Sequence, residues 1–244
     1  MHCQVSDWYG FERLDLTFEG RKAILIRPGA GDGRWMLKTE YFPAFQDLER
    51  ALVEKGFHLA YLENENRWGM DADQEAKARF RDFLCKEFSL KPRCLPIGMS
   101  CGGLHALQLA VRRPDMVSAL YLDAPVVNLF SCPFGFGIGS DIGPGARQEA
   151  LNALGLTRSQ LIAYRNQPID HLPALEKLRI PMALVWGDQD TTVPFEENGA
   201  YLKDLYERAQ IPHYFECKPG CGHHPHGPVQ MESAVEFLLR HTRD

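Results

Sequence analysis

A serine between two glycines is the part of the sequence best suited to chemistry. It lies in Gly98-Met99-Ser100-Cys101-Gly102, after an apolar segment and at the start of a helical pattern. Such a strand-to-helix turn holds the serine hydroxyl clear of the sheet, and its glycines avoid the collisions that a Cβ would cause. The amide of Cys101 then points to where an acyl oxygen becomes negative during attack. This pattern predicts Ser100 as a nucleophile and Cys101 as an oxyanion donor.

Two later loops can complete this chemistry, because a serine hydroxyl needs a base and the base needs an orienting acid. Residues 187–194 (GDQDTTVP) carry two aspartates, and residues 219–227 (PGCGHHPHG) carry three histidines. The candidate acids are Asp188, Asp190 and, after an earlier apolar segment, Asp123; the candidate bases are His223, His224 and His226.

Alternating strand and helix patterns supply the elements that would position these loops. Strands are expected at 12–18, 22–27, 34–39, 57–62, 93–97, 118–122, 181–186 and 213–217, with helices between most of them. The first two form a hairpin, and the rest indicate a mostly parallel sheet covered by helices on both faces. Each candidate loop follows a predicted parallel strand. Such loops meet at the carboxyl edge of the sheet, where Ser100 also falls.

With these motifs in this order, the chain resembles the α/β-hydrolases along nearly its whole length. The resemblance rests on GMSCG, GDQDTTVP and PGCGHHPHG. Within that family it is most similar to small bacterial serine esterases and prolyl-oligopeptidase-like hydrolases. It implies an α/β-hydrolase fold: a mostly parallel twisted sheet with antiparallel N-terminal strands, and a single domain, 1–244, with a lid at about 125–170.

The resemblance also implies roles for individual residues. The second aspartate of the acid loop, Asp190, would orient the base, and Asp188 would fix the loop. The first histidine after Gly-Cys-Gly, His223, would be the base. The family often marks its second oxyanion donor with His-Gly, which this sequence lacks, so an amide near Thr39 or Glu40 is expected instead.

Substrate contacts are expected from the loop before the first helix, the loop at 63–70, the lid and the histidine loop. These segments offer aromatic and charged side chains at the carboxyl edge. The candidate substrate-binding residues are Tyr41, Arg67, Trp68, Phe130, Phe134 and His224. We expect no metal site, since the helical H-E-x-x-H pattern is missing and the spacing offers no further ligands. No cofactor is required.

Composition limits the partners. The 244 residues carry 27 basic and 32 acidic side chains, a net charge of −5, so no basic stripe suggests nucleic acid. There is no apolar run long enough to span a membrane. Seven cysteines without a framework spacing favour a reducing compartment. We expect a cytoplasmic monomer or homodimer.

The predicted function is hydrolysis of a small-molecule carboxylic ester through an acyl-enzyme. Acylated sugars and aryl esters are the candidate substrates. The same triad also serves aminopeptidases, amidases and acyltransferases, although the chain is too short for the propeller domain of a full prolyl oligopeptidase. A non-catalytic ligand receptor on the same scaffold is the alternative from another class.

Overall fold

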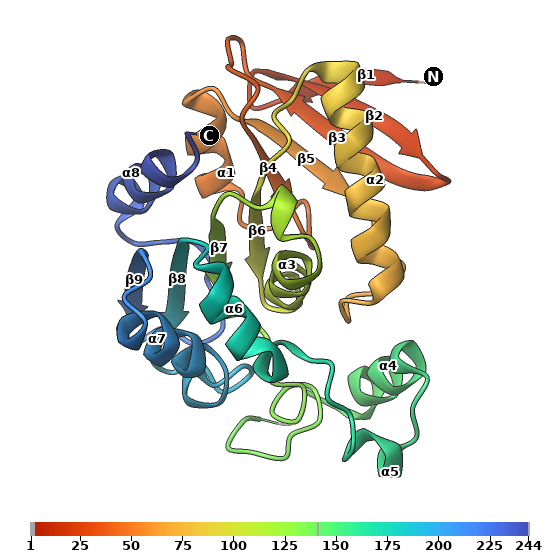
Figure 1. Cartoon of the computed structure of the whole chain (residues 1–244), viewed down its shortest axis with the longest axis vertical. Coiled ribbons are helices and arrows are strands. Elements are labelled where there is room, and N and C mark those ends of the chain that lie inside the picture. The colour runs from red at the N-terminus through yellow and green to blue at the C-terminus, as the bar shows by residue number, and fades with distance from the viewer. Residues whose placement is uncertain (1–2, 141, 244) are drawn as a thin grey trace.

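A computed structural model describes residues 3–140 and 142–243 and contains a mixed sheet with helices on both faces (Figure 1). The strand order is β1-β2-β3-β5-β4-β6-β7-β8-β9. The strands in the described residues are β1 (Gln4–Trp8), β2 (Phe11–Phe18), β3 (Arg21–Arg27), β4 (Trp35–Lys38), β5 (His58–Leu62), β6 (Leu95–Met99), β7 (Leu120–Asp123), β8 (Met182–Gly187) and β9 (His213–Lys218).

The sheet changes from antiparallel to parallel pairing at β5. β1, β2, β3 and β5 pair antiparallel in that order, whereas the pairs from β5 through β4, β6, β7, β8 and β9 are parallel. The predicted antiparallel start and mostly parallel sheet are therefore confirmed. The strand β1 was not predicted, because most of its side chains are exposed and only Trp8 is buried.

Helices cover the two faces unequally. The helices are α1 (Asp47–Glu54), α2 (Asp71–Phe88), α3 (Cys101–Arg112), α4 (Pro144–Leu154), α5 (Arg158–Leu161), α6 (Leu172–Leu178), α7 (Gly199–Arg208) and α8 (Met231–His241). α1 and α8 contact each other on one face, while α2, α3, α6 and α7 form a contiguous layer on the other (Figure 1). α4 and α5 lie apart from these layers, beyond the carboxyl ends of the parallel strands (Figure 1).

Two apolar cores hold the layers to the sheet, and a third connects it to the segment with α4 and α5. The side chains of Leu25, Leu37 and Leu122 pack under the larger helical layer. Those of Ile26, Met36 and Tyr121 pack under α1 and α8. This alternation of neighbouring residues between faces is the period-2 pattern of a strand buried on both sides.

A buried ion pair fixes the end of β4 relative to α1. Lys38 Nζ contacts the carboxylate of Glu49, and it also donates a hydrogen bond to the carbonyl of Ala44 (3.1 Å). Both charged side chains are almost fully buried, so removing either would leave an uncompensated charge in the interior. The contact sets the path of the chain just as it leaves β4 toward Thr39 and Glu40.

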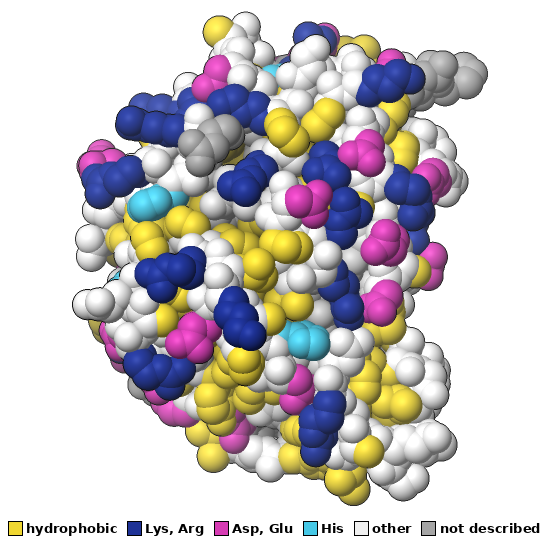
Figure 2. All heavy atoms as spheres, viewed as in Figure 1, with side chains coloured by type: hydrophobic (Ala, Val, Ile, Leu, Met, Phe, Trp, Pro, Cys, Tyr) yellow, Lys and Arg dark blue, Asp and Glu magenta, His cyan; other side chains and the backbone are white. Residues whose placement is uncertain are grey.

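Charged side chains of both signs are interspersed on the face in Figure 2, including the surface over α2. Arg79 on α2 pairs with Glu19 (2.8 Å), and Arg81 contacts Asp82 and Asp115. These two cations thus each lie near a carboxylate.

Candidate active site

Ser100 occupies a strained turn between β6 and α3. Its backbone has φ 52° and ψ −122°, a region that non-glycine residues enter at a cost of about 1–3 kcal/mol. Its amide donates to the Asp123 carbonyl (3.0 Å), and its carbonyl accepts from the amides of Gly103 (2.9 Å) and Val126 (3.0 Å). These three hydrogen bonds hold the turn in its strained conformation.

Gly98 permits this turn because its α-carbon faces backbone at close range. A Cβ built on Gly98 would lie 2.4 Å from the carbonyl oxygen of Gly102. The glycine spacing that predicted the turn from sequence thus has a direct steric cause.

Ser100, His223 and Asp190 form one hydrogen-bonded chain, although they come from three separate loops. The Nε2 atom of His223 lies 3.1 Å from the Oγ of Ser100. The Nδ1 atom of the same ring lies 2.7 Å from Oδ2 of Asp190. A carboxylate accepts hydrogen bonds, so Nδ1 carries the proton and Nε2 faces the serine as an acceptor. This is the tautomer that a general base requires.

The Asp190 carboxylate is fully satisfied and stays charged. Its Oδ1 accepts the backbone amides of Thr192 (2.8 Å) and Val193 (2.9 Å), and its side chain is 1% exposed. Burial alone would raise its pKa, but the hydrogen bonds from His223, Val193 and Thr192 outweigh burial and hold the pKa below the usual range of an aspartate. Asp188 instead accepts the amide of Gly220 (2.7 Å) and fixes the loop.

The predicted oxyanion donors lie at the start of α3 and just after β4. The first-turn amide of Cys101 is free of intrahelical partners and lies beside Ser100. The Thr39 amide is not available, because β4 still pairs with β6 there and this N–H donates to the Ile97 carbonyl (3.0 Å). Of the two predicted residues, Thr39 has its amide engaged in the sheet, so the prediction of an oxyanion donor stays with Glu40. The structure gives the Glu40 amide no partner within residues 3–140 and 142–243, and Glu40 packs against Gly102.

A buried polar network holds Glu40 in place. Asn64 donates to the Thr39 carbonyl (2.7 Å) and contacts the Glu40 carboxylate, and Lys77 of α2 contacts the Asn64 side-chain oxygen. Lys77 also lies 3.4 Å from Nδ1 of His105. Burial of Lys77, only partly offset by nearby Asp73 and Glu40, lowers its pKa to about 8.

A second histidine–carboxylate pair anchors the loop that carries His223. The Nδ1 atom of His226 lies 3.0 Å from Oδ1 of Asp123, and Oδ2 of Asp123 accepts the amide of Gly227 (2.6 Å). Lys218 reaches the same carboxylate (3.4 Å). Asp123 therefore binds His226, whereas Asp190 binds His223, so the two candidate acids have different histidine partners.

His224 lies at the surface of this loop. Its ring stacks on that of Phe45, with centroids 5.5 Å apart and planes 13° from parallel. Partial burial and the neighbouring histidines lower its pKa. Phe45 precedes α1, has φ 50° and is 40% exposed. Its contact with two histidines left no signal in the sequence.

Solved structures with this arrangement of strands and helices are numerous in one fold group. The acylaminoacyl peptidase of Pyrococcus horikoshii superposes with a TM-score of 0.71 at 15% identity, covering 99% of this chain and 42% of that one. A puromycin-hydrolyzing peptidase of Mycobacterium tuberculosis gives 0.72 at 16% identity, covering 99% and 39%. TT1662 from Thermus thermophilus gives 0.65 at 17% identity, with 100% of both chains covered. The chain has an α/β-hydrolase fold.

The two peptidases are longer proteins, and this chain spans less than half of each. No protein-family model matches the sequence, and no curated protein matches it significantly. At such low identity, the α/β-hydrolase likeness establishes the fold. Function is argued from the site itself.

Tyr41, Arg67 and Trp68 gather near Cys101, the residue that follows Ser100. The Tyr41 hydroxyl lies beside the Cys101 thiol and the Arg67 guanidinium, and burial raises the pKa of Tyr41. Arg67 lies over the Trp68 ring (5.2 Å) and pairs with Glu149 of α4 (2.6 Å). Trp68 is only 2% exposed and packs in the third core, while its contact with a substrate stays a prediction.

Residues 125–170, which the sequence predicted to form a lid, contribute aromatic side chains to a separate cavity. Phe134 is buried in the third core with Cys101 and Trp68, and Phe130 packs against that core half-buried. Phe134 and Phe136 line a cavity of about 220 Å³. Phe130 and Phe134 thus pack in the same core as Cys101, the residue after Ser100. Their contact with a substrate stays a prediction.

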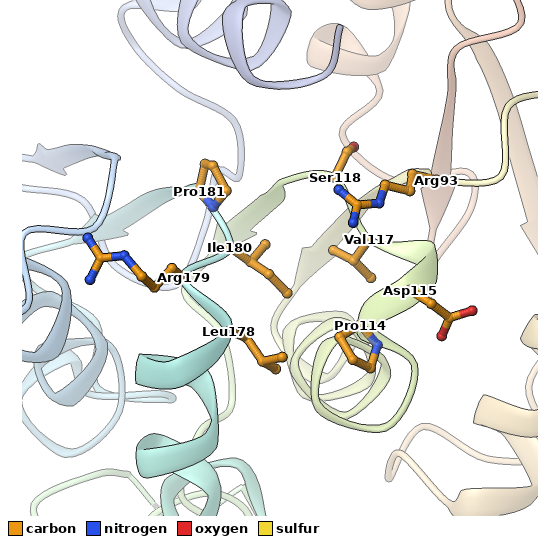
Figure 3. Close-up of a pocket in the computed structure, with 9 residues that line it drawn as sticks. All are labelled: Arg93, Pro114, Asp115, Val117, Ser118, Leu178, Arg179, Ile180 and Pro181. Carbon is orange, nitrogen blue, oxygen red and sulfur yellow. The ribbon is translucent and has the colours of Figure 1, made fainter. Parts of the chain in front are cut away.

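Figure 3 shows a different pocket of about 300 Å³, at the amino ends of β6, β7 and β8. Its walls include Arg93 before β6, Ser118 before β7 and Arg179 before β8. Ser100 follows the carboxyl end of β6, so this pocket lies at the opposite edge of the sheet from the triad. It therefore takes no part in the candidate site.

Within residues 3–140 and 142–243, no helix combines the length and apolar character needed to cross a lipid bilayer.

Proposed function

We propose that this chain is a serine hydrolase that cleaves a small-molecule carboxylic ester through an acyl-enzyme. One observation carries the proposal: His223 joins Ser100 Oγ (3.1 Å) to a buried, charged Asp190 (2.7 Å). The strained backbone of Ser100 adds to it, since such strain persists where function requires a fixed geometry.

In the proposed reaction, Ser100 Oγ attacks the ester carbonyl while its proton passes to Nε2 of His223. Asp190 stabilises the imidazolium that forms, without accepting the proton itself. The amides of Cys101 and Glu40 bind the oxyanion, each lowering the barrier by about 3 kcal/mol. His223 then gives the proton to the departing alcohol. Water attacks the acyl-enzyme with His223 again as the base, which frees the acid and restores Ser100.

The ester assignment follows from what the site itself provides. An alcohol is a better leaving group than an amine, so ester cleavage demands only the nucleophile, base and oxyanion donors described. Peptide or amide cleavage is the second candidate, because two of the solved structures with this fold are named peptidases.

The test is turnover of p-nitrophenyl acetate and butyrate, with matched p-nitroanilides, by the wild type and by Ser100→Ala. Ser118→Ala is the matched control, because Ser118 lies at the opposite edge of the sheet and bonds the Cys94 carbonyl (2.8 Å). We expect wild type and Ser118→Ala to cleave the esters and to react with a fluorophosphonate at Ser100. Equal activity of wild type and Ser100→Ala would refute the mechanism. Faster turnover of the anilides would replace ester by amide, and ligand binding without any turnover would indicate a receptor.

A further inference from the structure

Three histidines of one loop converge beside the nucleophile. His223, His224 and His226 each bring a ring nitrogen to within 4.8 Å of the others. Their ring centroids are 4.9–5.0 Å apart and the planes are inclined by 64° to 90°, so the three rings lie nearly equidistant from one another. We propose that these histidines bind a divalent transition-metal ion of the Zn²⁺ type, and that the bound ion blocks the serine chemistry.

Two of the three rings are already oriented by carboxylates. Asp190 binds Nδ1 of His223 (2.7 Å) and Asp123 binds Nδ1 of His226 (3.0 Å), which leaves Nε2 of each ring for a ligand bond. Histidine ligands of metals in proteins characteristically carry such a carboxylate on the other nitrogen, which fixes the ring and increases its basicity. Both carboxylates are buried, and Lys218 beside Asp123 offsets part of their charge.

The third ring can close the site. Bonds of about 2.0–2.1 Å to a tetrahedral ion place the nitrogens about 3.4 Å apart, so the widest present gap must shrink by about 1.4 Å. His224 is exposed, and its contact with Phe45 is a ring stack, which rotation of the His224 side chain can exchange for a ligand bond.

The donor set selects the class of ion. Three imidazoles suit Zn²⁺, Cu²⁺, Ni²⁺ and Co²⁺, whereas Mg²⁺ and Ca²⁺ prefer oxygen ligands. Three protein ligands leave a fourth position open to water. The sequence analysis expected no metal site, because spacings of one and two residues match no helical metal motif, and only the folded loop brings the three rings together.

Metal binding and serine catalysis compete for one lone pair. Nε2 of His223 faces Ser100 Oγ at 3.1 Å, and an ion on that nitrogen prevents it from accepting the serine proton. This inhibitory consequence rests on the proposed function, but the binding itself rests only on the histidine geometry.

Direct binding of Zn²⁺ by calorimetry, and of Co²⁺ by its tetrahedral visible absorption, tests the site in the whole chain. Wild type, Ser100→Ala, and His213→Ala, which removes a histidine of β9 outside the cluster, should each bind one equivalent. His224→Ala should bind at least about 10-fold more weakly, the smallest loss typical of changes near a bound metal. Cys221→Ser should retain binding, which excludes the nearby thiol as the ligand.

Activity supplies the second readout. Zn²⁺ should inhibit ester turnover by the wild type, with recovery on adding EDTA. His224→Ala should retain more of its own metal-free rate at the same Zn²⁺ concentration. The proposal is overturned if wild type binds no ion, or if His224→Ala and His213→Ala bind it equally well. If the metal-free protein cleaves nothing but still binds the ion through His224, the proposed function fails while the metal site stands.

Discussion

Replacing Asp190 by asparagine changes the hydrogen-bonding character of one atom while preserving the shape of the acid loop. The Oδ1 atom of the asparagine can still accept hydrogen bonds from the amides of Thr192 and Val193, which lie 2.8 and 2.9 Å from Oδ1 of Asp190 in the wild type. Its Nδ2 then takes the place of Oδ2 and donates a hydrogen bond to Nδ1 of His223. The imidazole proton consequently moves to Nε2, which can no longer accept the proton of Ser100.

The size of the loss follows from the 2.7 Å contact between Asp190 and His223. Two unit charges at that separation attract by about 6 kcal/mol at an effective dielectric constant of about 20. The carboxylate provides this attraction to the imidazolium formed in the transition state, and asparagine does not. Since 1.36 kcal/mol corresponds to a factor of ten, we expect kcat to fall by about 10⁴-fold.

The assay is steady-state hydrolysis of a p-nitrophenyl ester, with kcat and KM determined separately. We expect KM to change little, because Asp190 does not contact the substrate in the proposed reaction. Asp188→Asn is the matched control: its carboxylate bonds the Gly220 amide, and this variant should retain kcat within about tenfold. The reasoning is refuted if Asp190→Asn keeps kcat within tenfold of wild type, or if Asp188→Asn loses as much activity as Asp190→Asn.

Three further changes test other parts of the structure. Gly187→Ala places a Cβ 2.3 Å from the carbonyl oxygen of Cys221. This collision should push the acid loop and the histidine loop apart and lower kcat for the ester by at least about 10²-fold. Unchanged ester kinetics would contradict this prediction. Burial lowers the pKa of Lys77 to about 8, so the unfolded state binds more protons than the folded state between about pH 8 and 10. The free energy of unfolding of the wild type, relative to that of Lys77→Met, should therefore rise by roughly 2–3 kcal/mol from pH 7 to pH 10 in urea unfolding. A difference that stays constant with pH would disprove this prediction. The bridge between Glu149 and Arg67 has side chains 44% and 36% exposed, so Glu149→Gln should cost less than about 1 kcal/mol in the same assay, and a loss above 2 kcal/mol would show a larger role.

The sequence predicted those features of the fold that depend on local pattern. Apolar runs marked the strands from β2 to β9, and the glycines around Ser100 marked the turn that a Cβ at Gly98 would block. The strand β1 escaped prediction because it is held mainly by backbone pairing with β2, which imposes little on side-chain type. Thr39 was placed in the oxyanion hole because the sequence does not reveal where β4 stops pairing with β6.

Which histidine pairs with which carboxylate depends on tertiary structure, so the sequence alone did not decide it. β7 ends in Asp123 and β8 is followed by Asp190, and the parallel register of these neighbouring strands places both carboxylates under the same histidine loop. The spacing within that loop then decides which ring reaches which acid.

The histidine loop is held at both ends, and this explains why two such pairs lie together. At one end the Gln189 amide bonds the Cys221 carbonyl (2.8 Å), and at the other the Gly227 amide bonds Asp123 (2.6 Å). Asp123 therefore anchors the backbone and the His226 ring, while Asp190 orients the His223 ring toward Ser100. Because Asp123 anchors the loop and Asp190 holds Nδ1 of His223, Nε2 of His223 is available to whichever partner binds it more strongly, the serine proton or a metal ion.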